Sequence, residues 1–204
     1  EEMAYIVEDC GARAVVLSDH LRDRAAELAP ELSDAVRGRY MVGGTLDGWL
    51  SWEDALSEQP PTPVDEERVE GRDMLYSSGT TGRPKGVELP LPGTTLGTPD
   101  AIYMLVAGLF GGTADSVYLS PAPLYHAAPL RFVMAFQRAG ATVVVMERFD
   151  PLAALRLIEE HRVTHSQWVP TMFIRMLKLP AEERSSFDVS SLTCAIHAAA
   201  PCPV

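Results

Sequence analysis

The chain has 204 residues, of which 47% are hydrophobic and 22% charged, and its formal net charge at pH 7 is −11. This composition is ordinary for a globular protein and argues against a disordered chain, a collagen and a disulfide scaffold. The acidic balance also argues against a nucleic-acid binder and against docking on an anionic membrane surface.

The first part of the chain predicts short helices and strands up to a proline-rich connector at residues 59–63. Helical spacing of apolar residues, or apolar runs of strand length, indicates each element. The elements are a helix over residues 3–10, a strand over 14–17, a helix over 20–28, a strand over 39–42, and a loop with a short helix over 46–58.

The second part predicts a more regular alternation, with a strand at residues 73–76, a Gly/Thr/Pro-rich loop and a helix at residues 98–110. Apolar strands then alternate with helices, which predicts an α/β fold with a largely parallel sheet covered by helices on both faces. In such sheets, ligands bind at the carboxyl ends of the strands. The strands are predicted at 116–119, 141–145, 163–168 and 192–196, and the helices at 126–138, 151–160 and 170–177.

One loop concentrates residue types that bind phosphate. Residues 76–87 read Tyr-Ser-Ser-Gly-Thr-Thr-Gly-Arg-Pro-Lys-Gly-Val. Glycines let the backbone approach a ligand, hydroxyls donate to phosphate oxygens, and Lys85 supplies a compact positive charge. Pro84 stands where the Walker A loop needs glycine, so that motif is excluded. By composition alone, a flexible surface loop is the alternative.

The whole string closely resembles the phosphate-loop signature of the acyl-adenylate-forming, or AMP-binding, superfamily, and the chain is most similar to bacterial fatty-acid and acyl-CoA synthetases. In that family, the loop holds the β- and γ-phosphates of ATP while a carboxylate attacks the α-phosphate. The resemblance implies catalytic roles for Lys85 and Thr81. The residues that it implies in ATP binding are Ser77, Ser78, Gly79, Thr80, Thr81, Gly82 and Lys85.

Three later segments resemble motifs that line the acyl and adenine sites of the family. Residues 120–128 resemble a Pro-Leu-aromatic-His motif, and residues 168–171 resemble a strand-to-helix turn beside the acyl pocket. Residues 197–201 resemble a strand end that is more usually Gly-rich, so we expect that wall to differ in shape. The implied substrate-binding residues are Tyr125, His126, Val169 and Thr171, and the implied cofactor-binding residues are Ala198, Ala199, Ala200 and Pro201.

The resemblance covers only part of the family's large N-terminal domain. The chain begins Glu1-Glu2-Met3, and its last apolar strand runs straight into its end, so we interpret residues 1–204 as an internal piece of a longer protein. We expect a partial AMP-binding domain, without the family's C-terminal lid domain and inactive alone. Mg²⁺ is expected with ATP, bound by a residue outside this chain. We expect no metal site within it, because the strand-like residues between His161 and His165 argue against one helical pair.

The residues after the second motif favour an apolar acid. Between Ser120 and Gly140 there is no Asp or Glu to pair with a substrate ammonium group. His126 also stands where amino-acid-activating relatives have an Asp. A fatty or aromatic acid would suit the apolar side chains here, although part of the set is expected to face the core. The set is Ala127, Ala128, Leu130, Phe132, Val133 and Met134.

The resemblance implies a ligase that activates a carboxylic acid, with a fatty acid favoured, to an acyl-adenylate and then transfers it to coenzyme A. Two alternatives remain open: an enzyme that loads a carrier-protein phosphopantetheine, and a non-catalytic module that holds a nucleotide or acyl group. We expect only small-molecule substrates (the acid, ATP and coenzyme A), no nucleic acid and no integral membrane segment. A homo-oligomer is compatible with the sequence. The three cysteines suit a reducing compartment, so we expect a cytoplasmic protein.

Overall fold

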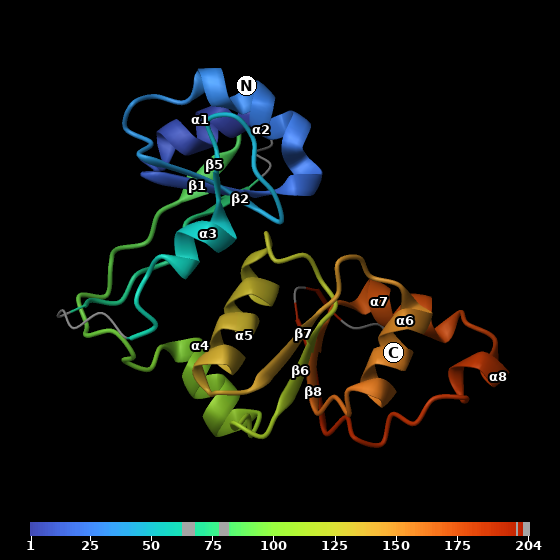
Figure 1. Cartoon of the computed structure of the whole chain (residues 1–204). Coiled ribbons are helices and arrows are strands. Elements are labelled where there is room, and N and C mark those ends of the chain that lie inside the picture. Colours follow the sequence, from blue (N-terminus) through green and yellow to red (C-terminus); the bar gives the residue numbers. More distant parts are fainter. Residues whose placement is uncertain (63–67, 78–81, 199, 202–204) are drawn as a thin grey trace. The chain divides into compact units, whose positions relative to one another are not determined.

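The computed structural model describes residues 1–62, 68–77, 82–198 and 200–201. The chain divides into two compact units, Glu1–Leu96 and Gly97–Val204, which Figure 1 colours from blue to green and from green to red. We refer to them as unit 1 and unit 2.

Unit 1 contains a parallel sheet with the strand order β1-β2-β3. Its core holds Ala25 and Leu28 of helix α2 with Met41 and Trp49, so α2 packs on this sheet. Met3 and Ala4 of helix α1 pack against the same cluster. The elements are α1 (Glu2–Asp9), β1 (Ala14–Ser18), η1 (Asp19–Leu21), α2 (Arg22–Leu28), η2 (Ala29–Glu31), β2 (Gly38–Val42), β3 (Leu50–Ser51) and α3 (Trp52–Ser57).

A two-stranded antiparallel hairpin follows within unit 1. Strands β4 (Leu75–Ser77) and β5 (Lys85–Val87) pair along their whole length. The predicted strand at residues 73–76 is therefore shifted by one to two residues. The assignment of Lys85 to the loop was wrong, because Lys85 begins the second strand. The short Lys-Gly-Val stretch carries no strand pattern by itself and becomes a strand through its pairing with β4.

Unit 2 contains a four-stranded sheet, in the order β7-β6-β8-β9, in which every neighbouring pair is parallel. This confirms the α/β fold and the alternation of strands and helices predicted from residue 116 on. The elements are α4 (Ala101–Met104), the π-helical segment η3 (Leu105–Leu109), β6 (Val117–Ser120), α5 (Ala127–Arg138), β7 (Thr142–Val145), α6 (Pro151–Glu160), β8 (His165–Trp168), α7 (Pro170–Leu177), α8 (Ala181–Arg184) and β9 (Cys194–His197).

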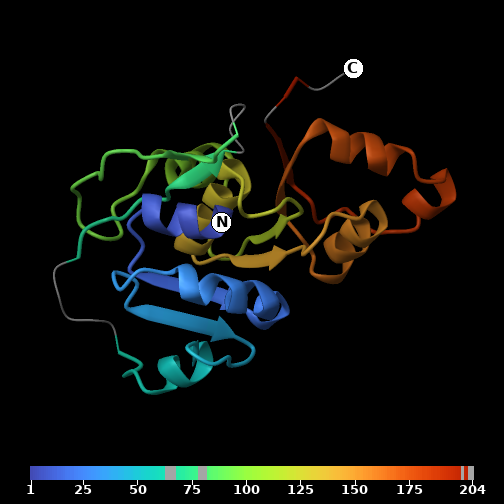
Figure 2. The ribbon, with the colours of Figure 1, turned by 90° about the horizontal axis from the view of Figure 1, so that it is seen from above.

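Helices cover both faces of the unit 2 sheet, as Figures 1 and 2 show. Tyr118 and Ile196 pack with the residues of α5 and η3 on one face. Leu119 and Trp168 pack with the residues of α6 and α7 on the other face. Tyr118 and Leu119 are consecutive in β6 and point to opposite faces, and both are fully buried. This burial on two sides explains the apolar residues 117–119 of β6, whereas β8 is buried although it carries His165, Ser166 and Gln167.

Side-chain capping marks the start of helices α4 and α6 in unit 2. Asp150 accepts a hydrogen bond from the Ala153 amide at 2.8 Å, and α6 begins at Pro151, as predicted. The helix predicted over residues 98–110 is shorter, because Asp100 caps it at the Tyr103 amide, and it changes to π-helical geometry after Met104. Within the described ranges, no helix combines the length and apolar character that crossing a membrane requires.

Candidate active site

Ser77 and Lys85 stand opposite each other on the two strands that frame the phosphate loop. The Ser77 hydroxyl donates to the Lys85 carbonyl oxygen at 3.5 Å. Both residues are exposed, and directly paired residues of antiparallel strands project from the same face. The hairpin therefore brings a hydroxyl and an ammonium group together at the base of the loop, a combination suited to phosphate oxygens.

The remaining predicted residues of this loop divide into two groups. Gly82 is exposed and has a φ of +105°, in the region that favours glycine. The predicted ATP-binding residues Ser78, Gly79, Thr80 and Thr81, the last also predicted to be catalytic, lie outside the described residues.

Gly86 lets the ring of Tyr76 lie across the hairpin. The two residues are directly paired, and a Cβ atom placed on Gly86 would lie 2.9 Å from Tyr76 Cζ. The same atom would lie 2.4 Å from the Cε atom of Met74. The ring thus fills the space that a side chain at position 86 would need.

Helix α1 contacts both ends of the phosphate loop. The Tyr76 hydroxyl donates to Asp9 Oδ2 at 2.5 Å, and the Tyr5 hydroxyl donates to Asp9 Oδ1 at 3.4 Å. On the other side of the loop, the guanidinium carbon of Arg83 lies 5.4 Å from the centre of the Tyr5 ring, within cation–π range. Loss of solvent, together with the hydrogen bond to Asp9 and its charge, raises the pKa of Tyr76 above its ordinary value. Tyr76 therefore remains a donor at neutral pH.

Sequence reasoning missed these α1 contacts. The only local signal is the spacing of four residues between Tyr5 and Asp9, which places both on one side of α1. Their partners are 67 residues away or more in the chain, and pairing over that distance depends on the tertiary fold.

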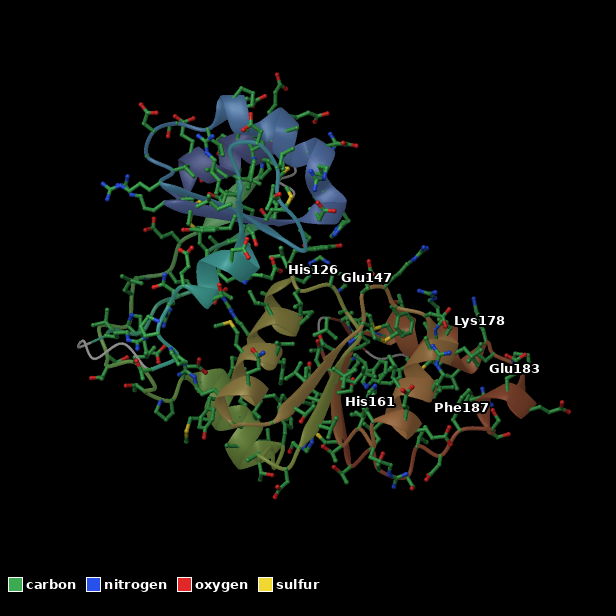
Figure 3. All side chains as sticks on the ribbon, in the orientation of Figure 1. His126, Glu147, His161, Lys178, Glu183 and Phe187 are labelled. Carbon is green, nitrogen blue, oxygen red and sulfur yellow. The ribbon has the colours of Figure 1, made fainter. Side chains whose placement is uncertain are left out.

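The predicted substrate-binding residues and the predicted cofactor-binding residue Ala198 follow neighbouring strands of unit 2. Tyr125 and His126 come after β6, Val169 and Thr171 come after β8, and Ala198 comes after β9. Because β6, β8 and β9 are adjacent and parallel, these segments leave the sheet at one edge. We call it the carboxyl edge. Figure 3 labels His126 there, beside the start of α5, and Glu147, which follows β7.

The carboxyl edge includes the point where the connections diverge. The chain after β6 leads to α5 on one face, and the chain after β8 leads to α7 on the other face. In open α/β sheets, such a divergence between adjacent strands marks the usual ligand crevice. The Ala198 amide donates to the Trp168 carbonyl oxygen at 3.2 Å, which keeps the segment after β9 beside the end of β8.

The side chains at this edge differ in their exposure. Tyr125 is 71% exposed, and its ring centre lies 4.5 Å from that of His126, which is the residue preceding α5. Thr171 is exposed and Val169 half-buried. Of the predicted wall after β9, Ala198 is half-buried, Ala200 and Pro201 are exposed, and Ala199 lies outside the described residues.

The apolar residues after His126 have two different locations. Phe132 and Val133 are buried in the core with Tyr118, so they face the sheet. Ala127 and Met134 are exposed, and Ala128 and Leu130 are half-buried. Part of the set therefore faces the core, as expected, and only the other part can contact a substrate.

The two histidines near β8 belong to different elements. His161 lies at the end of α6, whereas His165 is a buried residue of β8 whose Nε2 lies 2.9 Å from the Phe110 carbonyl oxygen. His165 Nδ1 lies 2.8 Å from the Thr164 hydroxyl. In the part of the chain that the structure describes, no three His, Cys, Asp or Glu side chains come together as a metal site would require.

A family model described as AMP-binding enzyme matches residues 1–204, the full length of the chain. The chain belongs to the AMP-binding enzyme family. Its fold and its phosphate-loop sequence agree with this family, and the resemblance seen in the sequence is confirmed.

Two curated relatives and one solved structure illustrate the AMP-binding match. The chain is 34% identical over 187 residues to 4-coumarate–CoA ligase 1 of Oryza sativa, covering 87% of this chain and 33% of the relative. It is 29% identical over 207 residues to the long-chain-fatty-acid–CoA ligase FadD13 of Mycobacterium tuberculosis, and this match covers 99% of this chain and 38% of the relative. The ATP-bound structure of MatB from Rhodopseudomonas palustris matches with a TM-score of 0.71 and 25% sequence identity. This match covers 98% of this chain and 38% of the MatB chain. The chain thus spans about two fifths or less of the length of these relatives.

Proposed function

We propose that the protein containing this chain is an AMP-forming acid–CoA ligase. It activates a carboxylic acid with ATP to an acyl-adenylate and then transfers the acyl group to the thiol of coenzyme A. The observation that carries the proposal is the hairpin that pairs Ser77 with Lys85 at the base of the phosphate loop. Membership of the AMP-binding family and the CoA-ligase names of both relatives support it.

In the first step, a carboxylate oxygen attacks the α-phosphorus of ATP, and pyrophosphate leaves. Negative charge accumulates on the leaving phosphates as the bond to the α-phosphorus breaks. Lys85 and Ser77 stabilise this charge, and Ser78, Thr80 and Thr81 complete the cradle with the backbone of Gly79 and Gly82. Because transfer needs little covalent help from the protein, such positioned donors supply most of the rate.

The acid and the adenine bind along the carboxyl edge of unit 2. Tyr125 and His126 lie beside the acid carboxylate, and Val169 and Thr171 form the turn next to it. The segment 198–201 forms the wall toward the adenine. This placement is supported by the adjacency of β6, β8 and β9 and by the divergence of the connections after β6 and β8.

A fatty acid is the favoured substrate within this proposal. The half-buried Ala128 and Leu130 offer apolar surface near His126, and residues 120–140 include no carboxylate to bind a substrate ammonium group. One relative is named for a long-chain fatty acid and another for 4-coumarate, so the acids tested must include aliphatic and aromatic members.

We propose that the chain is part of the larger N-terminal domain and that the lid domain and the protein ligand of Mg²⁺ are supplied by the rest of the protein. Mg²⁺ bound to ATP would neutralise phosphate charge. Because the complete site requires more than these residues, we expect the isolated chain to be inactive.

The acceptor thiol decides between the proposal and its alternatives. The complete protein is supplied with ATP, Mg²⁺ and palmitate, and then with either coenzyme A or a phosphopantetheinylated carrier protein. Formation of palmitoyl-CoA with release of AMP is the expected result. Transfer only to the carrier protein would replace the second step with carrier loading. Binding of ATP without any acyl-adenylate, when palmitate is replaced in turn by other aliphatic and aromatic acids, would indicate a non-catalytic module.

A further inference from the structure

The hairpin that carries Ser77 and Lys85 is too small to fix its own position. Strands β4 and β5 have three residues each, and an isolated two-stranded hairpin is marginally stable at best in water. Precise positioning of phosphate donors needs a rigid support, because catalysis by such groups depends on their placement. The hairpin therefore requires an anchor elsewhere in unit 1.

Helix α1 has the properties of that anchor. Its residues Met3 and Ala4 pack on the core of the three-stranded sheet, which fixes the helix to the larger part of unit 1. From the same helix, Asp9 accepts the hydrogen bond of Tyr76, and the Tyr5 ring lies under Arg83. Tyr76 and Arg83 stand on opposite sides of the loop, so the helix contacts both of its ends.

We propose that Asp9 and Tyr5 are positioning residues for the phosphate loop, which hold its two ends through Tyr76 and Arg83 and thereby set where Ser77 and Lys85 meet the triphosphate. This inference rests on the proposed function of the loop. Asp9 and Tyr5 touch no reacting atom and act through the hairpin.

The connection from Asp9 to Lys85 is short. Tyr76 precedes Ser77 directly, and its ring lies across Gly86, the neighbour of Lys85. A shift of the Tyr76 ring therefore displaces both strands at once. The second contact has a different chemical nature, because Arg83 is held by the face of an aromatic ring rather than by a hydrogen bond. Tyr76→Phe therefore removes the first contact and leaves the Tyr5 ring under Arg83 unchanged.

The test compares matched variants of the complete protein in acid-dependent exchange of pyrophosphate into ATP. Tyr76→Phe removes only the hydroxyl, and Asp9→Ala removes its acceptor together with the acceptor of the Tyr5 hydroxyl. Tyr40→Phe is the control for the tyrosine, since Tyr40 is half-buried in β2 and packs edge-on against Trp52. Glu8→Gln is the control for the acid, since Glu8 is an exposed residue of the same helix.

The anchor predicts an increase in the KM for ATP of about three- to tenfold in Tyr76→Phe and Asp9→Ala, with the KM for the acid unchanged, because a hydrogen bond to a charged partner is lost in a partly exposed place. The double variant should be no worse than either single variant. Asp9→Asn, which keeps an acceptor oxygen, should recover most of the affinity. Tyr5→Leu should raise the KM for ATP, whereas Tyr5→Phe keeps the ring under Arg83 and should have little effect.

A second readout does not depend on activity. Amide hydrogen exchange in β4 and β5 should be faster in Asp9→Ala than in Glu8→Gln, because the hairpin has lost its support. Equal exchange in the two variants, or a KM for ATP that stays at the wild-type value in a folded Tyr76→Phe variant, would overturn the anchor. If the wild-type protein shows no pyrophosphate exchange with any acid, the proposed function fails, and hydrogen exchange still decides on the anchor.

Discussion

Replacing Gly86 with alanine tests how closely the ring of Tyr76 packs on the hairpin. Gly86 is not among the glycines with positive φ, so alanine suits its backbone and only steric effects remain. The new Cβ atom would lie 2.4 Å from Met74 Cε and 2.9 Å from Tyr76 Cζ. Carbon atoms pack at about 3.5–4.0 Å, so both neighbours must move.

The two neighbours yield to different degrees. The Met74 methyl group is the end of a flexible chain and can rotate away at small cost. The Tyr76 ring must shift by roughly 0.6 Å or more, and its hydroxyl is held by Asp9. Overpacking at a well-packed site lowers the free energy of unfolding by about 1–3 kcal/mol. Because the Tyr76 ring is only half-buried, we expect a loss in the lower part of that range, about 1–2 kcal/mol.

The assay is urea unfolding of the chain, combined with the KM for ATP of the complete protein. Gly71→Ala is the matched control, because its Cβ atom would meet nothing within 4 Å and Gly71 also lacks a positive φ. The control should be neutral or slightly stabilising, since alanine restricts the unfolded chain. Gly86→Ala should lower the free energy of unfolding and raise the KM for ATP.

Two results would refute this reasoning. One is a Gly86→Ala variant as stable as Gly71→Ala with an unchanged KM for ATP. The other is full recovery of both quantities in the Met74→Ala, Gly86→Ala double variant, which would show that the Met74 contact and not the Tyr76 ring causes the effect.

Three further predictions concern catalysis, the core and acid stability. Lys85→Ala should slow adenylation by about 100- to 1000-fold, as expected for a lost electrostatic donor, and an unchanged exchange rate would contradict the role of Lys85. Leu119→Ala should lower the free energy of unfolding by about 2–5 kcal/mol, because Leu119 is fully buried. The control is Leu109→Ala, which changes a largely exposed residue. Equal urea midpoints for the two variants would contradict the packing of Leu119. Hydrogen bonds from Ser190 and Arg162 lower the pKa of Asp188 to about 2, so its stabilisation is present above about pH 4 and is lost as the pH falls toward 2. Asp188→Asn should therefore flatten the decline of stability between these pH values in acid unfolding, and an unchanged decline would exclude this role.

Helices and strands with a clear signal in their own residues, such as an initial proline or an apolar run, were predicted from the sequence. Helices α6 and α7 begin at Pro151 and Pro170, where proline fixes the first helical residue, and both were predicted with their observed bounds. Strands β6 and β7 were predicted from their apolar residues, as expected for a parallel sheet that helices cover on both faces. Strand β5 was missed because its residues form a strand only by pairing with β4.

In the candidate site, too, some features could be expected from the sequence, and others depend on tertiary packing. The parallel direction of β6, β8 and β9 follows from the alternation of elements, so the grouping of residues 125–126 and 169–171 at one edge could be expected, whereas the strand order could not. The hydrogen bond between Asp9 and Tyr76 could not, because it depends on how α1 packs on the rest of unit 1. The residues that we propose to bind phosphate were indicated by their composition, and the residues that we propose to support them were not.

The most direct test of the proposed adenylation is acid-dependent exchange of labelled pyrophosphate into ATP, measured without coenzyme A on the complete protein and on its Lys85→Ala variant. The acids range from acetate to palmitate and include benzoate and 4-coumarate. We expect exchange that requires one class of acid, with fatty acids favoured, and that is almost lost in Lys85→Ala. A folded complete protein that binds ATP and shows no exchange with any of these acids would contradict the proposal.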